Sequence, residues 1–419
     1  MPNNLDRQFP NPKDLAPLLK FQLPTIHRRQ RRLERALTIW DLREIAKKRT
    51  PQGPFDYTDG AAETEVSLRR ARQAFLDLAF VPNILQDVSS VDLTRKTLGR
   101  EFGMPVGIAP TGFTRMMQSE GERAGAKAAA KFNIPFTLST LGTTSIENVV
   151  TAAPEGDNWF QLYMWKDREG SMALVERAKK AGVRNLMLTV DVPVSGSRLR
   201  DSRNGLTVPP KLNAKTIINA IPRPEWVWNF LTTAPLQFAS MSSWNGTVGE
   251  LLDYMFDPTM TFDDLKWVRE QWDGTLTIKG IQNVEDATRC AKFGVDAIIL
   301  SNHGGRQLDR AVAPLHLLVD VKKEIRGDLE VHLDTGIMHG GDILVAIALG
   351  AQYTYVGRAY LYGLMAGGQE GVERALVILK EQMTRTMKLL GVNSLEELEP
   401  KHVKLLPTHA GLGQLPKRE

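Results

Sequence analysis

The sequence predicts an α/β protein whose parallel strands close into a barrel. Eight short apolar runs, each bounded by Gly, Pro or polar turn residues, follow one another along the chain. Most of the intervals between them hold an amphipathic stretch rich in Ala, Lys, Arg and Glu, such as GERAGAKAAAKF. No GxGxxG motif follows the first run, which disfavours a doubly wound dinucleotide-binding sheet. The pattern therefore predicts a (β/α)8 TIM barrel.

The expected strands are nearly continuous apolar segments, as in a sheet that is buried on both faces. In chain order they are MPVGIAP near residue 104, IPFTLST near 134, NWFQLYM near 158, NLMLTVD near 185, TLTIKG near 275, DAIILS near 296, EVHLDTG near 330 and YTYVGR near 353. One intervening stretch, SMALVERAKKAG, runs up to Gly182, and glycine commonly ends helices.

The chain divides into three predicted parts. Residues 1–75 form an N-terminal helical arm, residues 76–395 the cofactor-binding barrel, and residues 396–419 a C-terminal tail that ends in THAGLGQLPKRE. A long insertion, residues 192–260, follows the fourth strand and contains RPEWVWNFLTTAPLQFASM. Long insertions in compact domains are usually lids, binding loops or mobile segments.

The composition is that of a globular protein, with 42% apolar and 24% charged residues. The net charge is +5, and part of the excess lies in HRRQRRLER, residues 27–35. This segment fits either a solvated helical arm or a contact with anionic lipid or an acidic partner. Nothing else in the sequence resembles a nucleic-acid recognition module, so we expect no nucleic-acid partner.

The number of cysteines and the lengths of the apolar runs indicate the cellular compartment of the protein. The single cysteine, Cys290, excludes an intrachain disulfide and fits a reducing compartment. The segment MPNNLDRQFPNPKDL lacks the apolar region of a signal peptide, and no apolar run has the length of a transmembrane helix. We therefore expect a cytoplasmic protein.

Polar groups gather where the predicted strands end. In barrel enzymes the active site lies at the C-terminal ends of the strands. The residues found at these ends are APTG (109–112), Ser139 and Thr140, Gln161 and Tyr163, Thr189 and Asp191, Lys279, Ser301 and His303, Asp334, and Gly357 with Arg358. Barrel interiors are otherwise filled by Val, Ile and Leu, so these groups indicate an active site.

The segment SNHGGRQLD, residues 301–309, places His303 at a strand end beside two glycines. A lone histidine is more often structural than catalytic, but this position favours a general base, because the pKa of histidine lies near neutrality. A carboxylate would orient the ring and stabilise its charged form. Asp191 is the candidate, and Asp309 is the competitor that could instead cap a loop or a helix.

Arg306 could form a structural ion pair, or its guanidinium could bind a substrate carboxylate in bidentate geometry. A second arginine, Arg198, comes from the insertion. Arg200 lies so close to it in the sequence that either arginine could be the one that binds the substrate. Lys279 is costly at a buried strand end unless it meets a negative charge. Two arginines and one base indicate a small carboxylate substrate with an acidic hydrogen.

The last two predicted βα loops are rich in glycine. Barrels often bind phosphate there, through backbone N–H groups and a helix N-terminus. The residues concerned are Gly336, Gly340, Gly341, Gly357 and Arg358. We therefore expect a phosphate-bearing cofactor.

Several of these motifs resemble a known family. SNHGGRQLD, FQLYMWKDR, LTVDVP, IAPTGF and KGI are similar to segments of the FMN-dependent α-hydroxy-acid oxidases and dehydrogenases, and the likeness extends over residues 36–395. Within the family it is greatest to bacterial respiratory, quinone-linked L-lactate dehydrogenases. The resemblance implies FMN as the cofactor and no metal ion.

The resemblance also implies roles for individual residues. His303 would be the base and Asp191 would hold its imidazolium, with Tyr163 and Arg306 also catalytic. The substrate-binding residues would be Tyr57, Tyr163, Arg198 and Arg306. The FMN-binding residues would be Ala109, Pro110, Thr111, Ser139, Gln161, Thr189, Lys279, Ser301, Asp334, Gly336, Gly357 and Arg358.

The activity that the resemblance implies is oxidation of an L-2-hydroxy acid, above all L-lactate to pyruvate. Electrons would pass to a quinone or another respiratory acceptor. The family likeness further implies a homo-oligomer, a tetramer, with peripheral contact to the inner face of the cell membrane. The Trp-rich insertion fits either such a contact or a soluble lid or oligomer interface.

Two positions depart from the family pattern or divide it. Met338 stands where several members carry an arginine in the phosphate loop, and His339 or backbone amides are the candidates to compensate. Gly112 stands where the oxidases have alanine, which favours a dehydrogenase.

Other functions remain open at this point. One is an oxidase of the same family that uses O2, and another is a peptide-modifying flavin enzyme of the same superfamily, a branch expected to lack Arg306. A metal-dependent hydrolase could use His303, His332 and His339 as ligands, but no H-x-H or other metal-binding spacing lies near the first predicted strand. A thiol mechanism is disfavoured because Cys290 lies in a predicted helix. A flavin-free scaffold that binds partners through the basic arm would not need the catalytic set.

Overall fold

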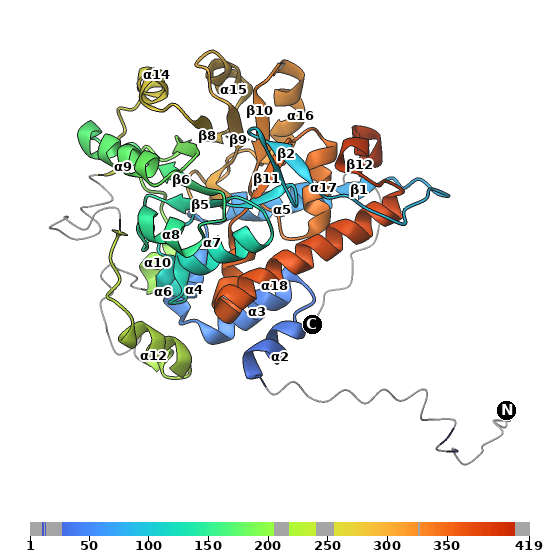
Figure 1. Cartoon of the computed structure of the whole chain (residues 1–419), viewed down its shortest axis with the longest axis horizontal. Coiled ribbons are helices and arrows are strands. Elements are labelled where there is room, and N and C mark those ends of the chain that lie inside the picture. Colours follow the sequence, from blue (N-terminus) through green and yellow to red (C-terminus); the bar gives the residue numbers. More distant parts are fainter. Residues whose placement is uncertain are drawn as a thin grey trace.

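The computed structural model of the protein describes residues 11, 13, 27–204, 218–239, 255–325 and 327–406. Eight parallel strands close into a barrel surrounded by helices (Figure 1). The barrel strands are β4 (Val106–Ile108), β5 (Phe136–Ser139), β6 (Asn158–Leu162), β7 (Asn185–Thr189), β8 (Thr275–Ile281), β9 (Ala297–Leu300), β10 (Glu330–Leu333) and β11 (Tyr353–Val356). Each overlaps one predicted run, so the TIM-barrel prediction is confirmed.

The barrel closes where β11 pairs with β4, with Tyr355 opposite Gly107. Side chains alternate between two cores, because successive residues of a strand point to opposite faces. One set fills the barrel interior and includes Trp159, Met187 and Tyr353. The other set packs under the surrounding helices. Since both faces are buried, the strands show no polar alternation in the sequence.

Helices follow the strands and cover the outside of the barrel. They are α6 (Thr114–Met117), α7 (Gly121–Lys131), α8 (Ile146–Ala152), α9 (Arg168–Lys180), α14 (Phe262–Gln271), α15 (Val284–Ala291), α16 (Pro314–Glu324), α17 (Gly340–Ala348) and α18 (Arg358–Leu390), with a short 3-10 turn η2 (His303–Gly305) after β9. As predicted, α9 ends just before Gly182, which has φ +79°.

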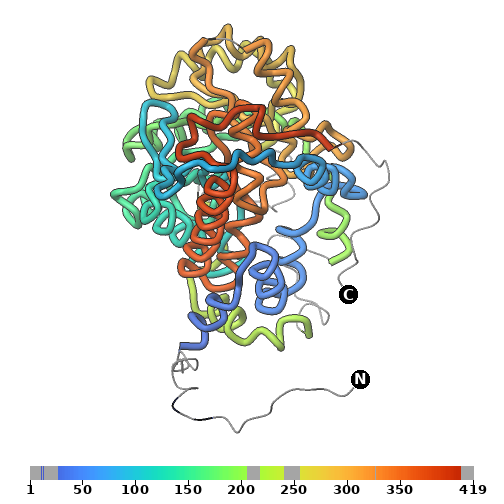
Figure 2. The backbone as a smooth tube through the Cα atoms, turned by 90° about the vertical axis from the view of Figure 1, so that its right-hand side faces the viewer, coloured from blue at the N-terminus to red at the C-terminus, as the bar shows by residue number. Residues whose placement is uncertain are grey.

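The described part of the N-terminal arm is helical. Its helices are α2 (Arg28–Glu34), α3 (Ile39–Arg49), α4 (Gln52–Asp59) and α5 (Val66–Leu76). Both α2 and α3 pack against α18, and Figure 2 shows these blue helices beside the red one. In contrast, α5 packs against η2 and α16, so the arm reaches the loop that follows β9.

Two small antiparallel sheets were not predicted. β2 (Arg95–Thr97) pairs with β3 (Arg100–Phe102), and β1 (Leu78–Phe80) pairs with β12 (Val403–Leu405). The Phe102 ring lies 5.7 Å from the Tyr353 ring inside the barrel, so the first hairpin covers the N-terminal end of the barrel. These three-residue strands carry mostly charged side chains at β2 and β3, and no apolar run marks them.

The described part of the predicted tail, 396–406, is folded rather than loose. It begins within η3 (Leu395–Glu397) and contains η4 (Pro400–His402) and β12, which is paired with β1. The segment THAGLGQLPKRE lies outside the described residues. The division into arm, barrel and tail therefore stays a prediction, with part of the tail joined to the end of the arm.

The insertion contributes two described helices, α10 (Leu199–Asn204) and α12 (Pro224–Thr232). Its residues 205–217 and 240–254 lie outside the described part of the chain. Arg200 of α10 pairs with Asp59 at 2.9 Å and with Glu65 at 2.5 Å. The first part of the insertion is thus fastened to the arm over the C-terminal ends of the strands.

Candidate active site

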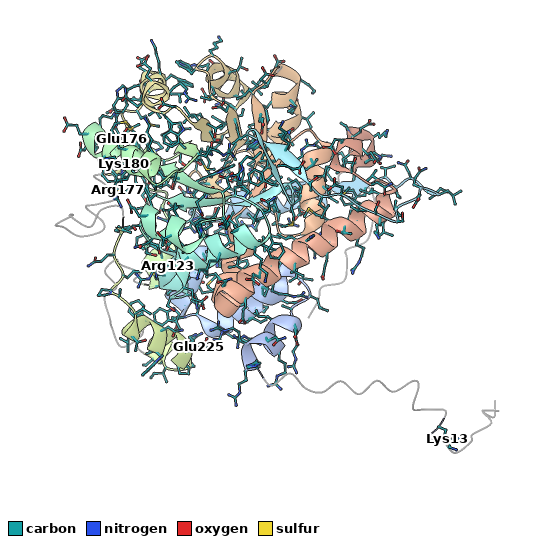
Figure 3. All side chains as sticks on the ribbon, in the orientation of Figure 1. Lys13, Arg123, Glu176, Arg177, Lys180 and Glu225 are labelled. Atoms are coloured by element: carbon teal, nitrogen blue, oxygen red, sulfur yellow. The ribbon has the colours of Figure 1, made fainter. Side chains whose placement is uncertain are left out.

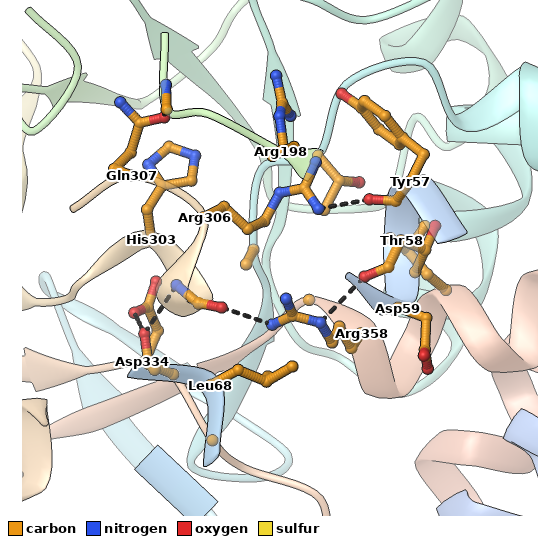
Figure 4. Close-up of a pocket in the computed structure, with 18 of the residues that line it drawn as sticks. Tyr57, Thr58, Asp59, Leu68, Arg198, His303, Arg306, Gln307, Asp334 and Arg358 are labelled. Atoms are coloured by element: carbon orange, nitrogen blue, oxygen red, sulfur yellow. Dashed lines mark hydrogen bonds between the residues drawn. The ribbon is translucent and has the colours of Figure 1, made fainter. Parts of the chain in front are cut away.

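A cavity of about 1400 Å³ lies at the C-terminal ends of the barrel strands. It is lined by residues from the arm, the barrel loops and the insertion, some of which are drawn in Figure 4. The predicted site residues that line it are Tyr57, Ala109, Pro110, Thr111, Tyr163, Arg198, Lys279, His303, Arg306, Asp334, Gly336, Gly357 and Arg358. The other five have buried side chains close behind this lining, and they are Ser139, Gln161, Thr189, Asp191 and Ser301.

His303 lies between a carboxylate and a phenol. Its Nδ1 is 3.0 Å from Asp191 Oδ1, and its Nε2 is 3.4 Å from the Tyr163 hydroxyl oxygen. An ionised carboxylate only accepts hydrogen bonds, so Nδ1–H donates to Asp191. In the neutral ring, Nε2 is therefore the nitrogen with the free lone pair. The predicted pairing of His303 with Asp191 is what the geometry shows.

The charges of this pair are set by burial and by neighbouring cations. Burial lowers the pKa of His303, Lys279 and Arg306 lower it further, and the opposing effect of Asp191 does not restore it. Burial alone would raise the pKa of Asp191, but the His303 ring and Lys279 outweigh this and leave it below its usual value. At neutral pH the site therefore holds a neutral imidazole on an ionised carboxylate, the arrangement that a general base requires.

The two glycines after His303 are needed for space and for backbone conformation. His303, Gly304 and Gly305 have φ of +58°, +65° and +74°, the left-handed region that favours glycine. A Cβ on Gly305 would lie 2.8 Å from the backbone nitrogen of Leu68, and a Cβ on Gly304 2.7 Å from Arg358 Nη1. The glycine pair thus lets the loop pass between α5 and Arg358 while the imidazole faces the cavity.

Arg358 holds the His303 loop against the arm. It donates to the carbonyl oxygens of Thr58 at 3.0 Å and Gly304 at 2.9 Å (Figure 4). It also donates to the carbonyl oxygen of Gly60 at 2.7 Å. Three of its five N–H groups are thereby used. The predicted phosphate contact of Arg358 stays a prediction that rests on the remaining two.

Asp309 is the competitor for the histidine partner, and it serves the loop instead. Its carboxylate accepts from the Ser67 backbone N–H at 2.8 Å and from the Thr64 hydroxyl at 2.8 Å. Burial raises the pKa of Asp309, but these hydrogen bonds outweigh it and hold the pKa at about 2. The residue ties the loop to the start of α5.

Two arginines face the same aromatic ring. The guanidinium carbons of Arg306 and Arg198 lie 4.7 Å and 5.3 Å from the centre of the Tyr57 ring. Arg306 donates to the carbonyl oxygens of Tyr57 and Gly60, and Arg198 is 3.6 Å from Asp201. Burial and the charge of Arg198 lower the pKa of Arg306 to about 10, so it stays protonated at neutral pH. The surplus of positive charge suits a carboxylate ligand.

The ambiguity between Arg198 and Arg200 is resolved by their partners. Arg200 is bound to Asp59 and Glu65, so its charge is already neutralised by the arm. Arg198 and Arg306 project toward one space beside Tyr57 in Figure 4. Arg198 is therefore the insertion arginine that is available to a ligand.

Lys279 is a buried cation in the wall of the cavity. Its Nζ lies 3.0 Å from Ser301 Oγ and 3.1 Å from Asp334 Oδ2. Burial lowers the pKa of Lys279, but the charges of Asp334 and Asp191 outweigh this and raise it. A permanent positive charge thus faces the cavity, where it would stabilise negative charge on a bound group.

Behind the same wall, the buried polar atoms without a partner among the described residues include two groups that can donate a hydrogen bond, namely Gln161 Nε2 and Thr189 Oγ1. Ser139 Oγ donates to Gln161 Oε1 at 2.9 Å, which fixes the amide with its nitrogen pointing the other way. Unsatisfied buried donors are costly and call for a ligand or ordered water. A flat group with a polar edge, such as the flavin ring of FMN, would satisfy them.

The opposite end of the cavity carries a cation that the sequence analysis did not assign. Arg72 of α5 donates to the Gly336 carbonyl oxygen and lies 2.6 Å from Asp342 Oδ2. The same carboxylate oxygen accepts from the Met338 backbone N–H at 2.8 Å. Arg72 thus stands beside the residue that lacks the family's loop arginine. It was missed because it belongs to a helix of the arm, far in sequence from any barrel strand.

The remaining histidines and the cysteine have other surroundings. His332 lies in the barrel interior, with Nε2 2.8 Å from Glu330, and His339 caps α17 by accepting from the Gly341 N–H at 2.8 Å. In the described part of the chain, no group of three or more His, Cys, Asp or Glu side chains could hold a metal ion. Burial raises the pKa of Cys290 to about 12, so its thiol is protonated at neutral pH.

Comparison with known proteins places this site in a family. The family model for FMN-dependent dehydrogenases matches residues 46–405. A Mycobacterium tuberculosis protein named "Putative L-lactate dehydrogenase" is 56% identical over 402 residues, which cover 96% of this chain and 97% of that protein. The L-lactate dehydrogenase of Xanthomonas campestris pv. campestris is 39% identical over 85% of this chain and 94% of its own. The crystal structure of a monotopic membrane protein, (S)-mandelate dehydrogenase, superposes with a TM-score of 0.85 at 36% identity, over 88% of this chain and all of that one.

The charge state of His303 predicts a pH profile for oxidation of a 2-hydroxy acid. A base must be neutral to accept a proton, and the pKa of His303 lies below the ordinary 6.5. We therefore expect kcat/KM to stay constant from neutral pH down to the ordinary value of 6.5. It should fall only at lower pH, near the pKa of His303, as the ring becomes charged. Steady-state rates across this range test it, and a decline that begins above pH 7 would contradict it.

Proposed function

The chain belongs to the FMN-dependent dehydrogenase family, and on that basis we propose that it oxidises an L-2-hydroxy acid, L-lactate, to the 2-oxo acid. The observation that carries this proposal is one cavity that holds a neutral base, His303 on Asp191, opposite the arginine pair Arg306 and Arg198. The names of the relatives support lactate as the substrate.

The site residues divide the chemistry between them. A substrate carboxylate would bind to Arg306, which donates to two backbone carbonyl oxygens, and to Arg198, whose ion pair with Asp201 is long at 3.6 Å. This places the hydroxyl-bearing carbon near His303 and Tyr163. Because Nδ1 is bonded to Asp191, Nε2 of His303 accepts the proton from the substrate. The ionised Asp191 then stabilises the imidazolium, as in a carboxylate–histidine pair of a hydrolase.

FMN, when bound, supplies the acceptor for the two electrons that leave the substrate. Gln161, Thr189 and Lys279 would hold the polar edge of its ring, since the first two carry unpartnered groups and the third a permanent charge. At the other end, the glycine-rich loops would bind the phosphate. Arg72, beside Met338, is the cation that would replace the family's loop arginine there.

We further propose a dehydrogenase that passes its electrons to a quinone rather than an oxidase that uses O2. Gly112, where the resembling oxidases carry alanine, supports this proposal. A Cβ at Gly112 would lie 2.7 Å from the Leu141 Cβ, so the wall of this cavity has no room for alanine unless Leu141 moves. The (S)-mandelate dehydrogenase to which the chain is similar is a monotopic membrane protein, which fits a lipid-soluble acceptor.

An anaerobic titration tests the proposed reaction. The purified FMN-loaded protein is mixed with L-lactate, and D-lactate, glycolate and L-mandelate serve as matched controls. We expect bleaching of the flavin absorbance by L-lactate, and rapid reoxidation by a water-soluble quinone but slow reoxidation by air. A yellow protein that no hydroxy acid bleaches would contradict the proposal and favour the peptide-modifying branch. Equally fast reoxidation by air would make it an oxidase.

We propose that α12 touches the membrane surface. Ile218, Ile221, Trp228 and Leu231 form an exposed apolar surface, here called the α12 patch, with exposed fractions of 67–74%. Glu225 of α12, labelled in Figure 3, lies 3.6 Å from Arg29, so α12 adjoins the basic helix α2. An apolar surface beside arginines suits an anionic lipid surface. No helix in the described residues is long and apolar enough to cross a membrane.

Vesicle sedimentation tests the α12 patch. We expect binding to vesicles that contain phosphatidylglycerol and weaker binding to pure phosphatidylcholine. The double variant Trp228→Ser/Leu231→Ser removes two exposed apolar side chains that the membrane would bury, so its partition coefficient should fall at least about tenfold. Leu389→Ser, which changes a side chain 71% exposed at the end of α18, is the matched control and should bind normally. Unchanged binding of the double variant would refute the contact.

A further inference from the structure

A chain of hydrogen-bonded side chains runs through the barrel interior below the cavity. The Tyr355 hydroxyl oxygen lies 3.0 Å from His332 Nδ1, and His332 Nε2 lies 2.8 Å from Glu330 Oε2. Thr97 and the Leu98 N–H also donate to the Glu330 carboxylate, the latter at 2.9 Å. These residues come from β10, β11 and the β2–β3 hairpin, and no step described above uses them.

The donors in this chain all point the same way. The Glu330 carboxylate can only accept, so the proton of His332 is on Nε2 and is donated to Glu330. His332 Nδ1 must then accept, and the Tyr355 hydroxyl donates to it. The phenol oxygen of Tyr355 is left with lone pairs that can accept a proton. The arrangement is a hydroxyl–imidazole–carboxylate relay with every hydrogen directed from Tyr355 toward Glu330.

The two ends of the relay lie in different environments. Tyr355 lines the cavity, and His332 is 0% exposed. The Glu330 side chain is 22% exposed and lies beside the hairpin that covers the N-terminal end of the barrel. Three side chains thus connect the cavity with solvent on the side of the barrel opposite the mouth of the site.

We propose that Tyr355, His332 and Glu330 form a proton path between the cavity and the solvent. The proposal rests on the proposed function, because a reduced flavin must give up a proton as well as two electrons when it is reoxidised, and an acceptor that takes electrons alone leaves that proton to the protein. In each passage one concerted shift moves a cavity proton onto Tyr355, the Tyr355 O–H proton onto His332 Nδ1 and the His332 Nε2 proton onto Glu330, which releases it to water. One proton enters and one leaves, and His332 must exchange its Nδ1 proton for one on Nε2 before the next passage.

Two features distinguish this chain from an ordinary buried polar cluster. Barrel interiors are usually filled by branched apolar residues, and polar groups there cost free energy unless they are bonded. The neighbouring Tyr353 shows the simple solution, since its hydroxyl donates to the backbone carbonyls of Met104 and Val106. Tyr355 instead bonds to a titratable ring. Burial and the charges of Glu330 and Asp334 raise its pKa well above the ordinary value, so proton transfer through it must be concerted.

Reoxidation by ferricyanide in a stopped-flow instrument tests the path and does not depend on lactate. The FMN-loaded protein is reduced photochemically without substrate and mixed with ferricyanide in weak buffer with a pH indicator. Each reduced flavin gives two electrons to two ferricyanide ions and one proton to the solvent. Flavin absorbance then reports electron transfer, and the indicator reports proton release.

In the natural protein we expect both signals to change together. Tyr355→Phe removes the first hydroxyl, and Glu330→Gln removes the terminal carboxylate. In both variants proton release should lag behind flavin oxidation by at least about tenfold. Tyr353→Phe is the matched control, because this equally buried tyrosine is bonded only to backbone, and it should show no lag.

The outcomes separate the two proposals. If proton release keeps pace with flavin oxidation in Tyr355→Phe and in Glu330→Gln, the path is refuted even if L-lactate bleaches the enzyme. If Tyr355→Phe does not fold, Glu330→Gln, altered at the partly exposed end, still decides. A lag in both variants supports the path, and it does so whether or not L-lactate proves to be the substrate.

Discussion

The buried hydrogen bond between Asp191 and His303 is the interaction on which the rest of the site depends. Burial disfavours the charged form of both groups, so an isolated buried imidazole would hold an accepted proton poorly and an isolated buried carboxylate would itself become protonated. Together they keep a neutral base on an ionised orienting group. The pair joins the end of β7 to the loop after β9, and a closed parallel barrel is what brings those two points within 3.0 Å.

Around this pair the site is assembled from three distant parts of the chain. The arm supplies Tyr57, the insertion supplies Arg198, and the loop after β9 supplies His303 and Arg306. Arg358 fastens the arm to that loop through backbone carbonyls. Positive charge therefore collects on one side of the cavity, where Arg306 donates to backbone carbonyl oxygens and Arg198 has only the long Asp201 contact at 3.6 Å among its described ion pairs, and this surplus suits an anionic substrate.

The sequence was sufficient for the barrel and for bringing most of the candidate site residues to one cavity. Buried parallel strands are continuous apolar runs, and their C-terminal ends must meet, so His303 and Asp191 could be paired before any coordinates. The roles of Arg198 and Arg200 could not be distinguished. The two arginines lie only two positions apart in an insertion, and the sequence does not indicate which of them pairs with the carboxylates of the arm. Arg72 could not be predicted as a site residue, because it lies on a helix outside the strand–helix repeat of the barrel.

The hydrogen-bonded side chains of Tyr355, His332 and Glu330 could not be predicted either, because the sequence of a strand buried on both faces does not show which residues point into the barrel. The short β1–β12 pairing was missed since three residues carry too little pattern.

The central claim is that His303 and Asp191 act as one unit, and a double-mutant cycle measures this directly. The variants Asp191→Asn, His303→Asn and the double substitution are loaded with FMN, and the rate constant of flavin reduction by L-lactate is determined for each by stopped flow. Each single change should slow reduction by about 10²–10⁴-fold, and the double variant should be no slower than His303→Asn alone, because the carboxylate acts only through the ring. If the two factors multiply in the double variant, Asp191 and His303 act independently and the account is contradicted.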